Sequence, residues 1–281
     1  MNYRFLLFPN FRKKALTLSY DDGVKQDKRL LEIMHKNGIK GTFNINSGNF
    51  SLDESKGVRM SEKSAKELYE SYDCEVACHG VKHLSLSQVP SAQAVADVVN
   101  DRINLENMFG KVIRGMAYAN GSYDDNAVEI LRQCGIAYSR TCITTESFGI
   151  PTDWLRLPTT CHHKNPKLMQ LAEEFLQDKP SHYFWSNANA AKLFYLWGHS
   201  YEFDNDNNWN VIEEFCQKVG GREDVWYATN IEIYDYVTAF DRLEFSANGK
   251  FVKNPSNIDV YLDYYGAQVI AKAGQTTTIK E

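Results

Sequence analysis

Short apolar runs alternate with segments of helical periodicity along most of the chain. The runs predict strands at residues 15–20, 42–46, 75–79, 113–118, 137–142, 193–197 and 224–228. The segments between them predict helices at about 24–37, 123–134, 166–177, 208–219 and 231–240, and two more that begin at Ser61 and Ser91. Repeated strand–helix units predict a mostly parallel α/β sheet, either closed into a barrel or open and doubly wound. In both arrangements the chemistry lies at the carboxyl ends of the strands.

The helix that begins at Ser91 shows how its core face is predicted. Its apolar residues recur at helical spacing and form a stripe that we expect to face the core: Val95, Val98, Val99 and Ile103. Gly38 and Gly135 follow two other predicted helices, where glycine commonly ends the last turn. These stripes and caps support the alternation of strands and helices.

The pattern changes after Asp241. Short stretches at 243–245, 251–252 and 260–263 predict strands, and Asn248-Gly249 predicts a tight hairpin turn between the first two. We therefore expect two parts: a (β/α) domain over residues 1–240, and a small β-appendage over residues 241–281 that packs on it.

Composition places the chain among ordinary globular proteins. Of 281 residues, 43% are hydrophobic and 24% are charged, which excludes extensive disorder and low-complexity scaffolds. The 31 basic and 36 acidic residues give a net charge of −5. Because nucleic acid binding needs a concentrated basic face, this balance argues against a nucleic acid partner.

The N-terminal sequence and the cysteines bear on the cellular compartment. The apolar stretch at 5–8 stops at Pro9 and is too short for the core of a signal peptide. No later run approaches the length of a membrane span. The six cysteines are spread through a chain large enough to fold without disulfides, so we expect reduced thiols. These features favour a cytoplasmic protein, unless a leader has been removed.

Two adjacent carboxylates, Asp21 and Asp22, follow the first predicted strand directly. Because side chains alternate along a strand, the two would point to different sides, so that one can bind a metal ion while the other faces a water on that ion. The alternative is an acidic cap for the helix that follows, a position where aspartate is common.

His79 and His83 follow the third predicted strand. One helical turn after the strand would bring both imidazoles to one point, as neutral ligands of zinc or a similar divalent ion. A zinc site that includes Cys74 and Cys78 is the alternative. Strand alternation places these two thiols on one face and His79 on the other, so we interpret them as core residues.

His199 follows another predicted strand, 193–197. A single histidine in that position is usually packed or solvated. The carboxyl ends of parallel strands share one rim, however, so the two aspartates and the three histidines are expected to meet there.

These five side chains are sufficient for a hydrolytic mechanism. A metal ion bound by Asp22, His79 and His83 would keep one coordination position open for water, which becomes acidic enough to lose a proton near neutral pH. Asp21 would accept that proton and His199 would donate one to the leaving group. The sequence therefore predicts hydrolysis of an amide or an ester.

Three motifs resemble those of one enzyme family. The sequence TLSYDDG at 17–23, the pair His79 and His83, and the stretch 196–199 are similar to the first, second and fifth motifs of polysaccharide deacetylases. These enzymes carry the NodB homology domain and form carbohydrate esterase family 4. The motifs occur in the family's order, and the likeness spans about residues 16–240.

The resemblance implies a fold, a substrate and a cofactor. The fold would be a distorted (β/α) barrel, and the reaction would remove N- or O-linked acetyl groups from a poly- or oligosaccharide. The cofactor would be one divalent metal ion, zinc before cobalt, nickel or manganese. In the family the first aspartate is the base, the second aspartate and the two histidines bind the metal, and the late histidine is the acid, which matches the roles given above.

The third motif departs from the family pattern Arg-x-Pro-Tyr-Gly. When Gly121 is aligned, Ala117 takes the arginine position and Asn120 the tyrosine position. The family arginine steadies the base, so Asp21 would lack that partner unless Arg114 or Arg156 replaces it. The backbone N–H of Asn120 remains available as an oxyanion donor.

The fourth motif is only partly present, at residues 153–156. We expect the substrate-binding residues to be Tyr118, Asn120, Trp154 and Arg156. His162-His163 are interpreted as part of a solvated loop. Two other functions stay open because of the altered third motif: a carbohydrate-binding protein that kept the metal site without turnover, and a hydrolase of the same fold that acts on small amides.

Overall fold

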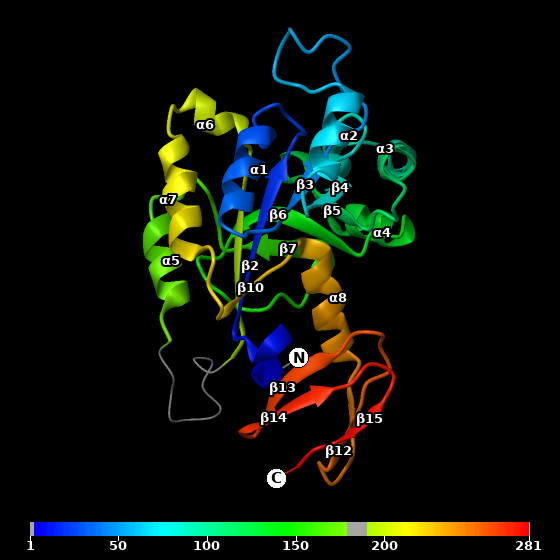
Figure 1. Cartoon of the computed structure of the whole chain (residues 1–281). Coiled ribbons are helices and arrows are strands. Elements are labelled where there is room, and N and C mark those ends of the chain that lie inside the picture. Colours follow the sequence, from blue (N-terminus) through cyan, green and yellow to red (C-terminus); the bar gives the residue numbers. More distant parts are fainter. Residues whose placement is uncertain (1–2, 179–189, 281) are drawn as a thin grey trace.

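The computed structural model of the chain describes residues 3–178 and 190–280. Its centre is a parallel sheet of nine strands in the order β7-β6-β5-β4-β3-β2-β9-β8, with β10 beside β2 (Figure 1). The strands are β2 Lys14–Asp21, β3 Gly41–Ile45, β4 Glu75–Cys78, β5 Gly115–Ala117, β6 Tyr138–Thr144, β7 Leu157–Thr159, β8 Cys161–His162, β9 Lys192–Gly198 and β10 Val225–Tyr227.

The sheet closes into a distorted barrel through one segment of chain. β7 pairs with β6, and β8, one residue further on, pairs with β9. This segment therefore links the two ends of the strand order. On the opposite side β2 is long enough to pair with β3 at its carboxyl end and with β10 at its amino end. The alternation predicted a mostly parallel sheet, either a barrel or open, and the distorted (β/α) barrel that the family resemblance implied is confirmed.

Helices cover the outside of the barrel (Figure 1). They are α1 Asp27–Lys36, α2 Glu62–Glu70, α3 Ser91–Phe109, α4 Asp125–Gln133, α5 Leu168–Leu176, α6 Tyr201–Asn205, α7 Trp209–Val219 and α8 Asn230–Asp241, with 3-10 turns at η1 Tyr3–Phe5, η2 Pro9–Phe11, η3 Leu86–Gln88, η4 Ala119–Gly121 and η5 Trp154–Arg156. Ser61 caps α2 as expected, because its side chain accepts the N–H of Ser64. The short elements β7, β8 and α6 had no counterpart among the sequence predictions.

The core face of α3 differs from the predicted one. Val95 and Ile103 are 38% and 47% exposed, whereas Asp97 and Asp101 are buried beside Val98. Val98 faces the core as predicted, but the two ends of the stripe do not, because the two aspartates have backbone donors to bind inside the protein, which apolar periodicity does not register.

The C-terminal region forms two small antiparallel sheets. Its strands are β11 Glu244–Phe245, β12 Phe251–Lys253, β13 Val260–Tyr264, β14 Ala267–Ala271 and β15 Thr276–Thr278. β11 and β12 pair as a hairpin around Asn248-Gly249, as predicted. The N-terminal strand β1 Leu6–Leu7 pairs with β13, so the first residues of the chain join the appendage sheet rather than the barrel.

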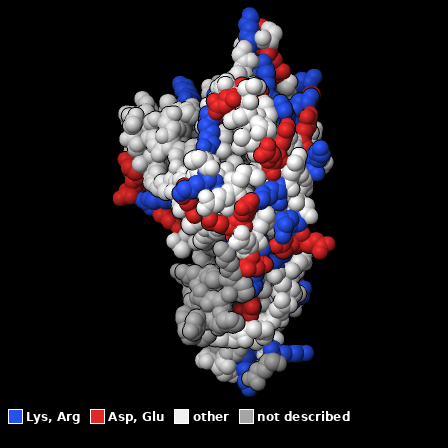
Figure 2. Space-filling model, turned by 90° about the vertical axis from the view of Figure 1, so that its left-hand side faces the viewer, with Lys and Arg blue, Asp and Glu red and all other residues white. Residues whose placement is uncertain are grey.

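The appendage packs on the barrel through a shared apolar cluster that includes Leu6, Phe8, Tyr236 and Leu262. It lies near the amino end of β2, opposite to the end that carries the candidate site (Figure 1). Basic and acidic side chains are interspersed on the face drawn in Figure 2. No helix in the described part of the chain has the length and apolar character needed to cross a bilayer. All six cysteines are free thiols.

Candidate active site

The site begins where β2 ends. Asp21 is the last residue of the strand, and Asp22 has a φ of +87°, in the left-handed region. This turn interrupts the strand alternation, so the two carboxylates do not diverge as the sequence suggested. Asp21 Oδ2 and Asp22 Oδ1 lie 3.8 and 3.9 Å from the same atom, Nε2 of His79.

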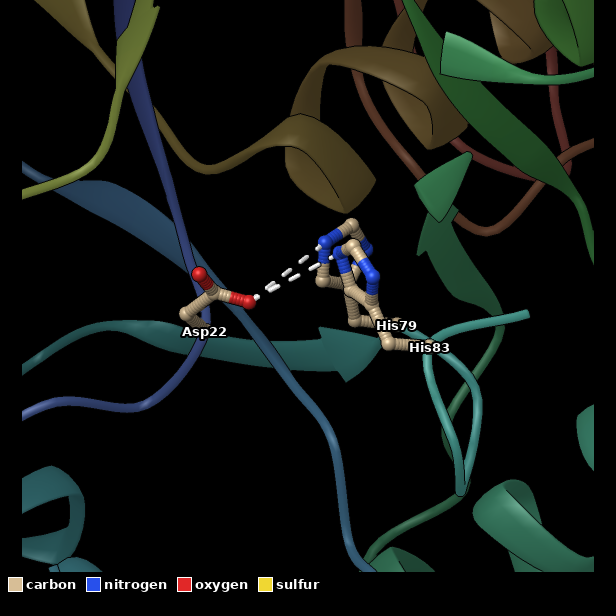
Figure 3. A group of neighbouring side chains, drawn as sticks. All are labelled: Asp22, His79 and His83. Carbon is tan, nitrogen blue, oxygen red and sulfur yellow. Dashed lines mark ion pairs between the residues drawn. The ribbon is translucent and has the colours of Figure 1, made fainter. Parts of the chain in front are cut away.

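Asp22, His79 and His83 form a compact group (Figure 3). Asp22 Oδ1 is 3.9 Å from His79 Nε2 and 3.8 Å from His83 Nε2, and the two imidazole rings are 4.7 Å apart. The loop that carries the histidines is not helical, which corrects the expectation of a helical turn. Instead, positive φ angles at Gly80 (+79°) and His83 (+55°) turn it back toward Asp22.

The hydrogen bonds of this group fit a divalent metal ion. Asp22 Oδ1 and His79 Nε2 are buried and have no hydrogen-bond partner. Nδ1 of His79 lies 2.9 Å from the carbonyl oxygen of Ala117, which places the ring proton on Nδ1 and leaves the lone pair of Nε2 free. Burial lowers the pKa of His79, so the ring is neutral despite the carboxylates beside it. One carboxylate and two neutral imidazoles are a common ligand set of catalytic zinc.

The guanidinium of Arg59 also contacts this group, at Asp22. Arg59 donates a hydrogen bond to the backbone oxygen of Asp22, and its Nη2 lies 3.5 Å from Oδ1 of the same residue. The guanidinium thus fixes the turn at Asp22 through the backbone, while Oδ1 keeps its free lone pair toward the histidines.

Buried carboxylates on α3 hold the histidine loop in place. Asp101 Oδ2 accepts the backbone N–H groups of His79 and Gly80, each at 2.9 Å, and Asp97 Oδ1 accepts that of Lys82 at 2.9 Å. A Cβ at residue 80 would lie 2.3 Å from Asp97 Oδ2, so only glycine fits there. Sequence reasoning missed both aspartates, although two acidic residues four positions apart on one helix were a visible signal.

A third buried carboxylate connects two strand ends. Asp27 on α1 accepts the N–H of Val24, just after the Asp21-Asp22 turn, at 3.1 Å. It also accepts the hydroxyl of Ser200, next to His199, at 2.5 Å. The two loops that supply the aspartates and His199 are therefore fixed relative to each other.

Asp21 is buried and paired with Arg140, a fully buried residue of β6. Asn44 Nδ2 donates to Asp21 Oδ1 at 2.8 Å, and the guanidinium of Arg140 stacks over the ring of Trp197 at 4.2 Å. Burial opposes ionisation of Asp21, but the charge of Arg140, with smaller contributions from His199 and the hydrogen bond from Asn44, outweighs it and holds the pKa of Asp21 below its ordinary value. The carboxylate is therefore ionised and able to accept a proton.

Arg140 fills the role for which the sequence offered Arg114 or Arg156, and neither of these reaches Asp21. Arg114 forms a two-point pair with Asp235 at 3.1 and 2.6 Å, and Arg156 pairs with two surface aspartates. An arginine in the middle of a predicted strand was the available signal for Arg140.

His199 follows β9 and faces Asp21 across the rim. Its Nε2 lies 3.9 Å from Asp21 Oδ2, and its Nδ1 lies 3.2 Å from Glu202 Oε2. Burial alone would lower the pKa of His199, but Glu202 and Asp21 together raise it above the ordinary value. The protonated imidazole is thus favoured, as an acid catalyst requires.

Only one of the four expected substrate-binding residues lies at the rim. Asn120, in the turn after β5, has a φ of +56° and donates its side-chain amide to Ser85 Oγ at 3.0 Å. Tyr118 is buried, and its hydroxyl donates to the carbonyl of Leu155 at 2.8 Å. Trp154 packs edge-on against Tyr234 of α8, and Arg156 is engaged in its surface ion pairs.

A second group of histidines lies beside the first, where a solvated loop was expected. His162 Nε2 and His163 Nε2 are 3.2 and 3.3 Å from Glu202 Oε2, the same oxygen that faces His199. His163 is buried against Gly198, and burial lowers its pKa to about 3. The structure thus brings together all five predicted catalytic and metal-binding residues and adds Arg140, Glu202 and this pair of histidines.

Comparisons with known proteins point to the same family as the sequence motifs. The polysaccharide deacetylase family model matches residues 9–139. This match confirms the resemblance predicted from the motifs and supports a hydrolase of amide or ester bonds. No curated protein matches the chain.

One solved structure shows the same fold at low sequence identity, and two others are less similar. A protein described as a polysaccharide deacetylase from Mycobacterium smegmatis aligns with 84% of this chain and 94% of its own, at 16% identity and a TM-score of 0.58. The deacetylase PplD of Streptococcus pyogenes, in complex with acetate, aligns over 50% of this chain at 19% identity and a TM-score of 0.44, and the match spans 62% of its length. A family 4 carbohydrate esterase of Streptomyces lividans, also with acetate, shows 12% identity over 77% of this chain and 93% of its own, with a TM-score of 0.49.

Proposed function

Starting from the match to polysaccharide deacetylases, we propose that this protein is a metal-dependent hydrolase that removes N- or O-linked acetyl groups from a poly- or oligosaccharide. One observation carries the proposal: the buried, unpartnered ligand atoms of Asp22 and His79 lie next to an ionised carboxylate, that of Asp21. A base beside a metal-binding group is the arrangement that hydrolysis of an acyl bond needs.

Asp22, His79 and His83 would hold the metal ion, which we propose to be zinc, with cobalt, nickel or manganese as alternatives. When bound, the divalent ion acts as a Lewis acid that polarises the acetyl carbonyl and lowers the pKa of water. The α3 carboxylates keep the histidine loop in position for this role.

Asp21 and His199 would move the protons. Asp21 accepts a proton from the attacking water, whose oxygen forms the new bond to the acetyl carbon. His199 donates its Nε2 proton to the sugar nitrogen or oxygen as the acyl bond breaks. The products are acetate and a free amine or hydroxyl, and the two side chains have exchanged one proton each with the reactants. The backbone N–H of Asn120 would stabilise the oxyanion.

Arg140 bears on the alternative of a binding protein without turnover. That alternative arose because the third motif lacks the arginine that steadies the base, and Arg140 supplies this contact from β6. The base therefore has the support that the altered motif removed, and we favour an active enzyme.

The test is acetate release from acetylated chito- and xylo-oligosaccharides by the zinc-loaded protein, with and without a chelator. We expect release that the chelator abolishes and no release by His83→Ala. The control His35→Ala, which changes a histidine in the last turn of α1 that packs against Tyr72, should release as much acetate as the wild type. No release despite binding of metal and sugar would support the binding protein. Release from small acetamides alone would support the small-amide hydrolase.

A further inference from the structure

Glu202 lies at the centre of the second histidine group, which also contains His162 and His163. Nitrogen atoms of three histidines lie around its Oε2: His162 Nε2 at 3.2 Å, His163 Nε2 at 3.3 Å and His199 Nδ1 at 3.2 Å. The backbone N–H of His199 donates to the same oxygen at 3.2 Å. Glu202 is therefore bound to both the ring and the main chain of His199.

The carboxylate is fixed from its other side by a cation. Lys164 Nζ lies 3.1 Å from Glu202 Oε1 and 2.8 Å from Asp206. Burial raises the pKa of Glu202, but the bonds from His162, His199 and Lys164 outweigh this and lower it below its ordinary value. Glu202 is thus a fixed anion.

The hydrogen bonds of this group argue against a second metal ion. His162 Nδ1 accepts the backbone N–H of Lys164 at 3.1 Å, so the proton of the neutral ring is on Nε2, the atom that faces Glu202. A nitrogen that carries a proton cannot ligate a metal. The ammonium of Lys164, 3.1 Å from Glu202 Oε1, would also repel a metal cation bound to the same carboxylate. His162 is therefore a hydrogen-bond donor to the carboxylate, whereas His163 Nε2 lies 3.3 Å from it without forming a hydrogen bond.

We propose that Glu202 is the positioning residue of the proton donor: fixed by Lys164 and His162, it binds Nδ1–H of His199 and turns Nε2 toward the base and the scissile bond. The assignment of His199 as donor rests on the proposed function. The positioning of its ring by Glu202 does not, and it is measurable without any substrate.

The surroundings of His199 show what Glu202 contributes. Asp21 is 3.9 Å from its Nε2, and the aromatic rings of Tyr201, Trp197 and His162 lie within 5.3 to 6.2 Å of its own. Asp22 adds a more distant negative charge. Without Glu202, the direct contact with Asp21 alone would oppose the effect of burial, and Nδ1 would have no acceptor from α6.

The direct test is the substitution Glu202→Gln with the titration of His199 followed by NMR of ¹⁵N-histidine in the zinc-loaded protein. The His199 signal is assigned with His199→Gln. We expect the pKa of His199 to fall by about one unit or more, the scale of a lost opposite charge within 4–6 Å. The matched control Asp206→Asn, which removes another carboxylate bound to Lys164, should leave the titration unchanged.

Kinetics supply a second readout. Since the donor must be protonated, the alkaline limb of the kcat profile should move to lower pH in Glu202→Gln, with a fall in kcat of about 10- to 100-fold and an unchanged KM. Glu202→Asp keeps the charge on a shorter side chain. It should restore part of the kcat and move the alkaline limb of the profile part of the way back.

The possible outcomes separate the two proposals. An unchanged titration of His199 in a folded, zinc-binding Glu202→Gln would overturn the positioning role. Equal shifts in Asp206→Asn would overturn it as well, because they would show a general charge effect. A wild-type protein that releases no acetate contradicts the proposed function only, while the NMR result still decides the role of Glu202.

Discussion

Two groups of histidine and carboxylate side chains lie at the carboxyl end of the barrel, and only one is built like a metal centre. Within residues 3–178 and 190–280, Asp22, His79 and His83 form one group and His162, His163 and Glu202 the other. In the first, the facing atoms of Asp22 and His79 have no hydrogen-bond partner. In the second, the histidine nitrogens surround a single carboxylate oxygen at 3.2 to 3.3 Å.

The difference shows that ligand type and proximity do not define a metal site. The hydrogen-bond partner of the ring nitrogen that faces away from the group decides whether the other nitrogen can bind a metal ion. In His79 a backbone carbonyl fixes the proton on Nδ1 and frees Nε2, whereas in His162 a backbone N–H occupies Nδ1 and leaves the proton on Nε2. The first group can therefore bind a cation, and the second can stabilise an anion.

The largest expected effect tests this comparison directly. His79→Ala should lower zinc affinity by more than about 100-fold, because removal of a ligand exceeds the 10- to 100-fold loss typical of its outer partners. His162→Ala should keep the affinity and a stoichiometry of one zinc per chain. Titration calorimetry with a competing chelator measures both. Two zinc ions per chain, or lost zinc in His162→Ala, would show that the second group also binds metal.

Asp21→Asn should separate the base from the metal ligands beside it. The amide cannot accept the proton of the attacking water, so the rate of acetate release should fall by at least about 100-fold. Zinc affinity should stay close to that of the wild type, because Asp21 is not among the ligands. Near-normal turnover in this variant would contradict the assignment of the base.

The second group should be visible in the pH dependence of stability. The pKa of His163 is lowered to about 3, so the unfolded chain takes up a proton below pH 6.5 that the folded protein excludes. The neutral His163 side chain therefore contributes its full stabilisation above the pKa of histidine in the unfolded chain, and this stabilisation is lost as the pH falls. Between pH 6.5 and 5 this loss is about 2 kcal/mol.

Removal of this titration should be measurable in a variant. His163→Phe keeps a ring between Tyr20 and Phe203 and cannot titrate. Urea unfolding at pH 6.5 and 5 should show a smaller loss of stability in this variant than in the wild type. Equal losses in the two proteins would mean that His163 is protonated in the folded state.

The smallest expected effect concerns the support of the first group. Asp101→Asn replaces one acceptor oxygen by an amide that faces the N–H groups of His79 and Gly80 or that of Ser47. The histidine loop should shift and zinc affinity should fall by about 10-fold, as measured by chelator competition. Asp125→Asn, an exposed carboxylate on α4, is the control. Unchanged affinity in Asp101→Asn would show that the loop keeps its shape without this anchor.

The sequence by itself determined the alternation of strands and helices and therefore a parallel sheet, whereas the closure of that sheet through β7 and β8 was decided by the tertiary structure. The sequence also placed Asp21, Asp22 and His199 at strand ends, because periodicity and chain order are local properties and parallel strands bring their carboxyl ends together. These local properties suffice to predict the principal residues of the site.

Only the tertiary structure decided which groups hold those residues. Arg140 reaches Asp21 across 119 positions of sequence, and Asp101 reaches the histidine loop from a helix face that the apolar pattern assigned to solvent. Such contacts form because buried polar atoms need hydrogen-bond partners, and only the folded chain shows which atoms are close enough to supply them. The same is true of the two histidine groups, which use similar residues and differ in the hydrogen bond on the far side of the His79 ring and of the His162 ring.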